Sequence, residues 1–220
     1  MTKGFSVLRA RKAQLNIAAQ VVHIDFFQYP IQLIGGVDVA YRNERAIGAW
    51  VVLEWGSWKL VDYAVGVVKV KFPYVPTLLS FREVYPCIVA WKKLRVKPII
   101  SLVDGQGILH PYRAGFASHL GVVLDIPTIG VAKKLLCGTV SEWRGDTAPI
   151  IDRGTVIGYA LKTRGRPIYV STGHRVSLKT AVSIVRKCIT KYRLPEPIRA
   201  AHAKAKEAAE NYLNFTGSRF

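Results

Sequence analysis

The sequence predicts an α/β domain in which helices flank a mixed β-sheet that begins with an antiparallel meander of three strands. Three strand-like segments joined by short turns lie within residues 31–71, a pattern typical of a meander. A continuous apolar run at residues 98–103 indicates a strand buried on both faces. Strand-like and helix-like segments then alternate, which indicates crossover connections. We therefore expect a central sheet of five strands or slightly more.

The first third of the chain supplies a helix and the meander. Leu8, Leu15, Ala18 and Val22 recur among Arg and Lys within residues 7–22, which predicts an amphipathic helix. The three strands of the meander are expected at residues 31–41, 46–55 and 58–71.

The rest of the chain alternates. Thr77 is expected to be the N-cap of a helix that runs to Leu94, and Pro86 predicts a kink within it. Further strands are expected at residues 98–103, 128–132, 156–162 and 167–171, and further helices at 114–124, 177–192 and 197–213. No repeat or linker divides the chain, so we expect one domain over residues 1–220.

Composition limits the classes of function. Lys and Arg number 32 against 14 acids, a net charge of +18, which favours nucleic acid as the partner over a membrane surface. The three cysteines are far apart, which argues against a disulfide framework or a zinc site. The chain opens with no signal peptide, and no apolar run reaches the ~18 residues of a membrane span. We expect a cytoplasmic, monomeric protein with no membrane partner.

Three acids stand in apolar surroundings. Asp38 lies within the first strand, Glu83 shares a helical stripe with apolar residues, and Asp104 ends the buried run at 98–103. A lone carboxylate in such a place is costly unless it is paired or bound to a metal. One interpretation is three separate internal salt bridges, for which the chain has abundant Arg.

The other interpretation is that the three carboxylates converge on one divalent cation. Oxygen ligands without Cys or His spacing suit Mg²⁺ or Mn²⁺. A strand-centre Asp, a helical Glu and a strand-end Asp resemble the metal site of ribonuclease H-like nucleases, where metal ions support phosphodiester hydrolysis.

Six motifs in order go further, because together they closely resemble the endonuclease V family, whose members are deoxyinosine-directed nucleases. The resemblance runs from about residue 31 to residue 202. The motifs are Gly36–Tyr41, Phe72–Pro76, Phe81–Glu83, Asp104–Gly107, His110–Pro111 and Ile126–Lys133.

The resemblance implies a ribonuclease H-like fold and a Mg²⁺-dependent endonuclease, with Mn²⁺ able to substitute. It implies damaged DNA containing deoxyinosine as the partner, and hydrolysis of the second phosphodiester bond 3′ to the lesion. Some relatives act on inosine in RNA, so inosine-containing RNA remains an alternative substrate.

The resemblance also assigns the catalytic residues. Asp38 and Asp104 become the main metal ligands, and Glu83 completes the acidic site. Lys133 would meet the scissile phosphate as a fixed charge, with Lys134 as a possible substitute.

The lesion is expected to be recognised by loops. Tyr74, on a loop stiffened by Pro73 and Pro76, would enter the space that the extruded base leaves in the stack. The glycines Gly105, Gly107 and Gly115 would shape a pocket in which the main chain reads that base.

Other assignments are less specific. Arg82 is expected either to pair with an acid or to contact phosphate. His110 is expected to help place DNA or the metal shell, and the histidine His202 of the C-terminal helix motif to reach the active centre.

One class of alternative remains open on the sequence alone: a non-catalytic, basic nucleic-acid-binding module whose acids form structural ion pairs. The segment Ser171–His174 also departs from the family, which more often has proline at its second position.

Overall fold

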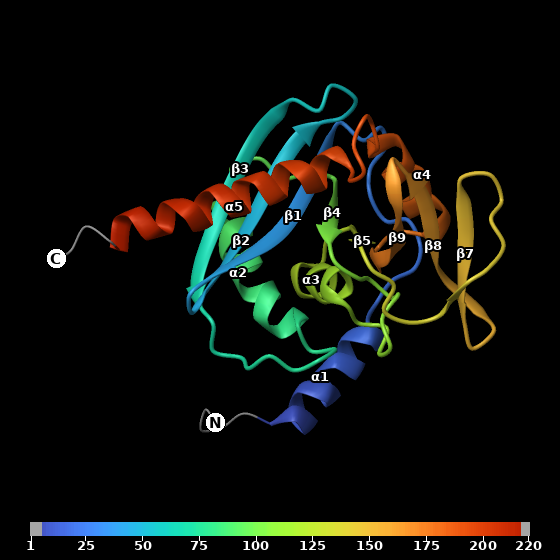
Figure 1. The fold of residues 1–220 in the computed structure, drawn as a ribbon, viewed down its shortest axis with the longest axis horizontal. Coiled ribbons are helices and arrows are strands. Elements are labelled where there is room, and N and C mark those ends of the chain that lie inside the picture. Colours follow the sequence, from blue (N-terminus) through green and yellow to red (C-terminus); the bar gives the residue numbers. More distant parts are fainter. Residues whose placement is uncertain (1–5, 217–220) are drawn as a thin grey trace.

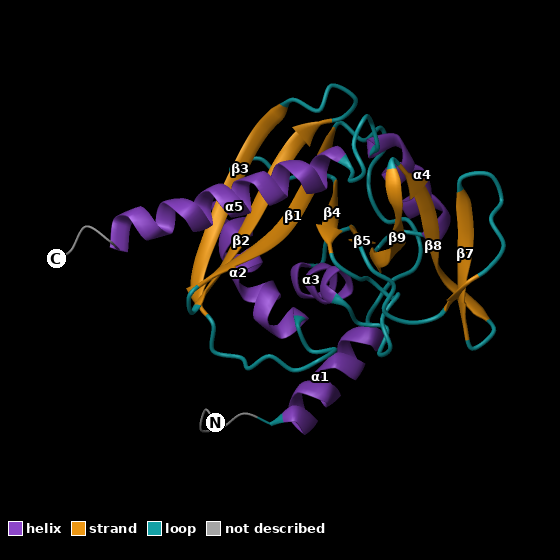
Figure 2. Ribbon diagram, viewed as in Figure 1, coloured by secondary structure: helices purple, strands orange, loops and turns teal. Residues whose placement is uncertain are grey.

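The computed structural model describes residues 6–216, with side chains described up to residue 212. One sheet forms the centre of the molecule, and helices cover both of its faces (Figure 1, Figure 2). This architecture confirms the expected α/β fold. The sheet has nine strands within the described residues, more than the roughly five expected.

The elements follow one another in the order α1, three strands, α2, β4, α3, five further strands, and finally α4 and α5, so the expected alternation of strands and helices is limited to the middle of the chain. The strands are β1 (Leu33–Arg42), β2 (Arg45–Glu54), β3 (Leu60–Lys69), β4 (Ile100–Asp104), β5 (Thr128–Ala132), β6 (Thr139–Val140), β7 (Thr147–Asp152), β8 (Thr155–Thr163) and β9 (Gly165–His174). The helices are α1 (Val7–Ala19), α2 (Ser80–Lys93), α3 (Phe116–Leu124), α4 (Leu178–Cys188) and α5 (Glu196–Thr216). Across residues 6–216, no helix combines the length and apolarity needed to cross a bilayer.

The sheet is mixed, in the order β3-β2-β1-β4-β5-β9-β8-β7-β6. The first three strands form the expected antiparallel meander. β4 and β5 then add in parallel to β1, and the remaining pairs are antiparallel. β6 and β7 were not expected, because they are short, and β7 carries Pro149, a residue that disfavours strands.

The two faces are covered by different helices. α5 packs on β1 and β2 and α4 on β8 and β9, whereas α2 packs on β2 and β3 and α3 on β5 and β9 (Figure 1). The backbone of α5 approaches β1 closely, because a Cβ at Gly36 would lie 1.9 Å from the carbonyl oxygen of Pro197. Glycine at that position thus lets the C-terminal helix lie directly on the central strand.

Two details of the helices differ from expectation. α1 is present, but Leu8 and Leu15 are exposed, and the residues it buries are Ala10, Gln14 and Ile17. Its apolar positions therefore did not identify the face that packs.

Thr77 is not the N-cap of α2. It has a positive φ of 66° and precedes the helix, whose N-cap Leu79 makes no side-chain capping bond.

The segment Ser171–His174 lies within β9.

Candidate active site

Asp38 and Asp104 lie side by side on neighbouring parallel strands. Gly36 pairs with Leu102 and Val37 with Val103, so the next residue on each strand is an aspartate. Their side chains are only 12% and 10% exposed, respectively. One oxygen of Asp38 accepts the backbone N–H of Val39 at 2.8 Å, which orients this carboxylate. The parallel pairing of β1 and β4 thus brings together two acids that are 66 positions apart in sequence.

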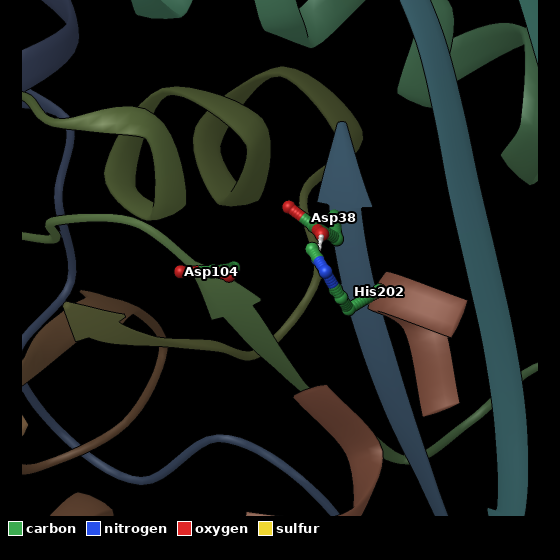
Figure 3. Close-up of side chains that lie close together, drawn as sticks. All are labelled: Asp38, Asp104 and His202. Atoms are coloured by element: carbon green, nitrogen blue, oxygen red, sulfur yellow. Dashed lines mark hydrogen bonds and ion pairs between the residues drawn. The ribbon is translucent and has the colours of Figure 1, made fainter. Parts of the chain in front are cut away.

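The imidazole of His202 is the third side chain of this cluster. It stands on α5, and its Nδ1 lies 2.7 Å from Oδ2 of Asp38 (Figure 3). Ligand atoms of Asp38, Asp104 and His202 all lie within 4.8 Å of one another. His202 therefore lies beside the acids, where the family resemblance led us to expect a histidine of the C-terminal helix.

Lys133 follows the end of β5 and forms an ion pair with Oδ2 of Asp104. Its side chain is 38% exposed, so the ammonium group also faces the open side of the site. Lys134 also lines the cavity beside the acids, but it forms no ion pair with them among the described residues, and its backbone carbonyl oxygen accepts a hydrogen bond from Gln106. Of the two tandem lysines, Lys133 is the one whose charge lies at the acids.

Glu83 approaches the same cluster from α2 and is electrostatically coupled to it. Burial, together with the negative charges of Asp38 and Asp104, raises the pKa of Glu83 to about 8. Burial and the charge of Asp38 also raise the pKa of Asp104. Within residues 6–216 Glu83 makes no ion pair, so the idea of three separate salt bridges does not describe this carboxylate.

We expect Glu83→Gln to stabilise the metal-free protein at high pH. The unfolded chain releases this proton near the usual value of 4.5, whereas the folded protein retains it up to about pH 8. The folded state thus loses stability as the pH rises between these values, and a neutral amide removes the loss. Thermal unfolding in EDTA should show a melting temperature several degrees higher for the variant at pH 8 and a smaller gain at pH 5.

The exposed residue Glu142 offers a matched control for this experiment, because Glu142→Gln removes an equivalent charge outside the cluster. A gain in melting temperature that is equal at the two pH values, or shared by the control, would contradict the coupling of Glu83 to the aspartates.

The donor set fits a divalent cation. Two aspartates, a nearby glutamate and an imidazole offer hard oxygen ligands and one nitrogen, a combination suited to Mg²⁺ or Mn²⁺. After burial, the negative charges of Asp38 and Asp104 are the main causes of the raised pKa of Glu83, so the three carboxyl groups repel one another when ionised. A bound cation would offset that repulsion.

A cavity of about 520 Å³ opens beside the acids. Glu83, Asp104 and Lys133 line it together with Thr77 and the exposed Tyr74. The remaining walls are mainly apolar and include Phe116, Leu135 and Leu136, with the main chain of Gly105 and Gly115. Its size and apolar walls suit a flat heterocyclic ring next to the reacting phosphate.

Tyr74 stands on the loop between β3 and α2 and is 68% exposed. Phe72 anchors the start of that loop, because its ring stacks on Phe81 of α2 with 5.2 Å between centroids. Pro73 and Pro76 flank the tyrosine, as expected. An exposed aromatic ring on a short, restrained loop is available to stack on nucleobases.

Arg82 lies beneath that loop. Its guanidinium is 5.1 Å from the ring centre of Tyr41 and 6.0 Å from that of Tyr74. Two roles were expected for Arg82, pairing with an acid and contact with phosphate. In the described part of the chain it forms no ion pair with an acid, so contact with phosphate stays a prediction.

The three glycines have different surroundings. Gly105 and Gly115 line the cavity, but Gly107 does not. Its N–H donates to Oγ of Ser171 at 3.0 Å, and a Cβ there would lie 1.9 Å from the carbonyl oxygen of Thr172. Gly107 is therefore needed for packing of the loop on β9.

His110 lines the cavity but is only 4% exposed. Burial and the charge of Arg11 lower the pKa of His110 to about 4, so the imidazole is neutral at pH 7. Nothing in the sequence around His110 indicates that α1 supplies a charge here.

Comparison with known proteins identifies the family. A family model described as Endonuclease V matches residues 15–203. The chain belongs to the endonuclease V family. An endonuclease V from Thermofilum pendens is 51% identical over 208 residues, which cover 93% of this chain and 90% of the relative.

Solved endonuclease V structures share the fold. The crystal structure of the Streptomyces avermitilis protein superposes with a TM-score of 0.88 at 35% identity and covers 94% of this chain and 95% of its own. Ciona intestinalis endonuclease V, solved in complex with a 23mer DNA containing an inosine followed by a ribo-adenosine, has a TM-score of 0.82 at 31% identity. The coverage in that case is 94% of this chain and 98% of the Ciona chain. Membership of the endonuclease V family confirms the predicted family and supports a nuclease acting on nucleic acid.

Proposed function

We propose that this endonuclease V family member is a divalent-metal-dependent nuclease that recognises deoxyinosine in DNA. The cut falls at the second phosphodiester bond 3′ to the lesion, and the lesion stays in the nicked strand. The catalytic domain spans residues 1–220. The observation that carries the proposal is the convergence of Asp38, Asp104 and His202 beside a cavity that can accept a base.

Asp38, Asp104 and Glu83 would hold the metal, Mg²⁺ with Mn²⁺ as a substitute, and His202 adds a nitrogen to the set. When bound, the cation supplies Lewis-acid stabilisation of the negative charge that develops on the phosphate and the leaving 3′ oxygen. The protein's own contribution is orientation. The hydrogen bond between His202 and Asp38 and the N–H of Val39 fix the first carboxylate, and Lys133 fixes the second.

Lys133 has a second role in this proposal. A cation on the open side of the acids would attract the scissile phosphate and stabilise charge in the transition state. Lys133→Met should lower the single-turnover rate of nicking by roughly 100-fold, and Lys134→Met should lower it far less. Equal effects in a quenched-flow assay would contradict the distinction between the two lysines.

The lesion would enter the cavity after leaving the base stack. Tyr74 would occupy the space left behind, and Arg82 and the neutral His110 would contact the backbone or line the pocket. The main chain of Gly105 and Gly115 would lie against the ring edge, while Gly107 supports the loop.

A substrate panel tests the proposed function. End-labelled duplexes and single strands carry one deoxyinosine, a deoxyinosine followed by a ribo-adenosine, one inosine within RNA, or no lesion. Nicking of deoxyinosine DNA that exceeds nicking of the matched adenine control supports the proposal. Cleavage confined to the RNA strands would support the ribonuclease alternative, and binding without cleavage of any strand would support a non-catalytic module.

A further inference from the structure

Helix α1 contacts the rim of the cavity through Gln14. This residue is only 1% exposed, and its side-chain amide donates to two carbonyl oxygens, those of Thr77 at 2.7 Å and Ala114 at 3.1 Å. One carbonyl belongs to the Tyr74 loop and the other precedes Gly115 at the start of α3. A single buried amide thus joins the two loops that border the cavity.

Arg11 completes the contact from the preceding turn of α1. Its Nη2 donates to Oγ1 of Thr77 at 3.0 Å, and its Nη1 donates to Oε1 of Gln14. The guanidinium also lies 3.7 Å from the ring centre of Tyr112. The guanidinium is therefore held on one side by an aromatic ring, with one donor directed at Thr77 and the other at Gln14.

Thr77 is the residue in these contacts whose backbone is unusual. Its φ of 66° lies in the left-handed region, which β-branched side chains disfavour. It lines the cavity three residues after Tyr74. Such a conformation persists only where surrounding contacts impose it, and both the carbonyl and the hydroxyl of Thr77 are bound by α1.

We infer that Arg11 and Gln14 are positioning residues that hold Thr77 in its left-handed conformation and so fix the Tyr74 loop at the cavity rim. Both lie before residue 15, where the match to the family model begins. The consequence for lesion discrimination rests on the proposed function, whereas the ordering of the loop does not.

The first test compares Arg11→Met with Arg9→Met. Both variants remove one positive charge from α1, but Arg9 is exposed, and the guanidinium that donates to Thr77 belongs to Arg11. The ratio of affinity for deoxyinosine duplex to affinity for the adenine duplex should fall roughly tenfold for Arg11→Met. It should stay unchanged for Arg9→Met, because a lost phosphate attraction weakens both duplexes equally. Equal ratios for the two variants would overturn the inference.

The second test adds Thr77→Gly. Glycine adopts a positive φ without steric cost, so the loop of the Thr77→Gly variant depends less on the contacts that Arg11 and Gln14 make. Arg11→Met should then change the affinity ratio less than about twofold in the Thr77→Gly background. A loss as large as in the Thr77 background would mean that α1 supports the fold generally and does not act through Thr77.

Hydrogen exchange of the DNA-free protein separates this inference from the proposed function. Amides of residues 74–79 should exchange faster in Arg11→Met and Gln14→Met than in the wild type, while those of β1 stay protected. If the wild type shows no preference for deoxyinosine, the proposed function fails. The exchange rates still report whether Arg11 and Gln14 order the Tyr74 loop. Unchanged exchange in Arg11→Met, whose side chain is only partly buried, would overturn the inference even if Gln14→Met does not fold.

Discussion

Asp104→Asn is expected to abolish nicking of deoxyinosine DNA while DNA binding survives. The amide has the size of the carboxylate but lacks the charge that holds a divalent cation, and Lys133 loses its ion-pair partner. We expect the single-turnover rate to fall by roughly 1,000-fold or more. Affinity for DNA should be retained or slightly increased, because one negative charge leaves a phosphate-binding surface.

Asp146→Asn is the matched control, since this aspartate pairs with Arg186 on the surface and takes no part in the cluster. It should nick at the wild-type rate. Wild-type cleavage by Asp104→Asn in Mg²⁺ would exclude Asp104 as an essential metal ligand. Loss of DNA binding together with cleavage would point to misfolding, which circular dichroism detects.

Tyr74→Ala should weaken binding to deoxyinosine DNA more than binding to undamaged DNA. The ring is exposed and free to stack where a base has been extruded, and only the lesion complex contains that vacant space. Loss of one base–aromatic stack corresponds to ~1–3 kcal/mol, or roughly 5- to 150-fold in affinity.

Tyr85→Ala offers the comparison, because Tyr85 is similarly exposed (62%) but lies on α2 outside the cavity. Fluorescence anisotropy with the two duplexes measures both variants. Equal losses on lesion and undamaged DNA for Tyr74→Ala would remove its proposed role as the residue that replaces the extruded base.

The sequence singled out the three acids that lie near one another in the structure, while their role as metal ligands stays a prediction. Asp38 and Asp104 each stand in a run with the pattern of a buried strand, and parallel pairing places such residues together at one edge of a sheet. Glu83 was found by its helical spacing. The position of His202 agrees with the expectation from the family resemblance. The residues next to it in the sequence do not indicate a contact with Asp38.

Other features had no local signal. The short strand β6 and the proline-containing β7 are stabilised by pairing with each other and with β8, which a local pattern does not reveal. Gln14 looks like a surface residue of a basic helix, and its burial depends on carbonyl groups 63 and 100 positions away. Thr77 looks like an N-cap until its φ is known.

Metal dependence and cleavage position, measured together, show whether a bound cation cuts DNA at a bond chosen by the base in the cavity. Wild-type protein acts on a duplex with one deoxyinosine and a labelled 5′ end, in EDTA and across a series of Mg²⁺ concentrations, and fragment length is read at nucleotide resolution. We predict no product in EDTA, and in Mg²⁺ a fragment that ends one nucleotide beyond the lesion. Equal cleavage in EDTA, or fragments that end elsewhere, would contradict a metal-dependent cut directed by the base in the cavity.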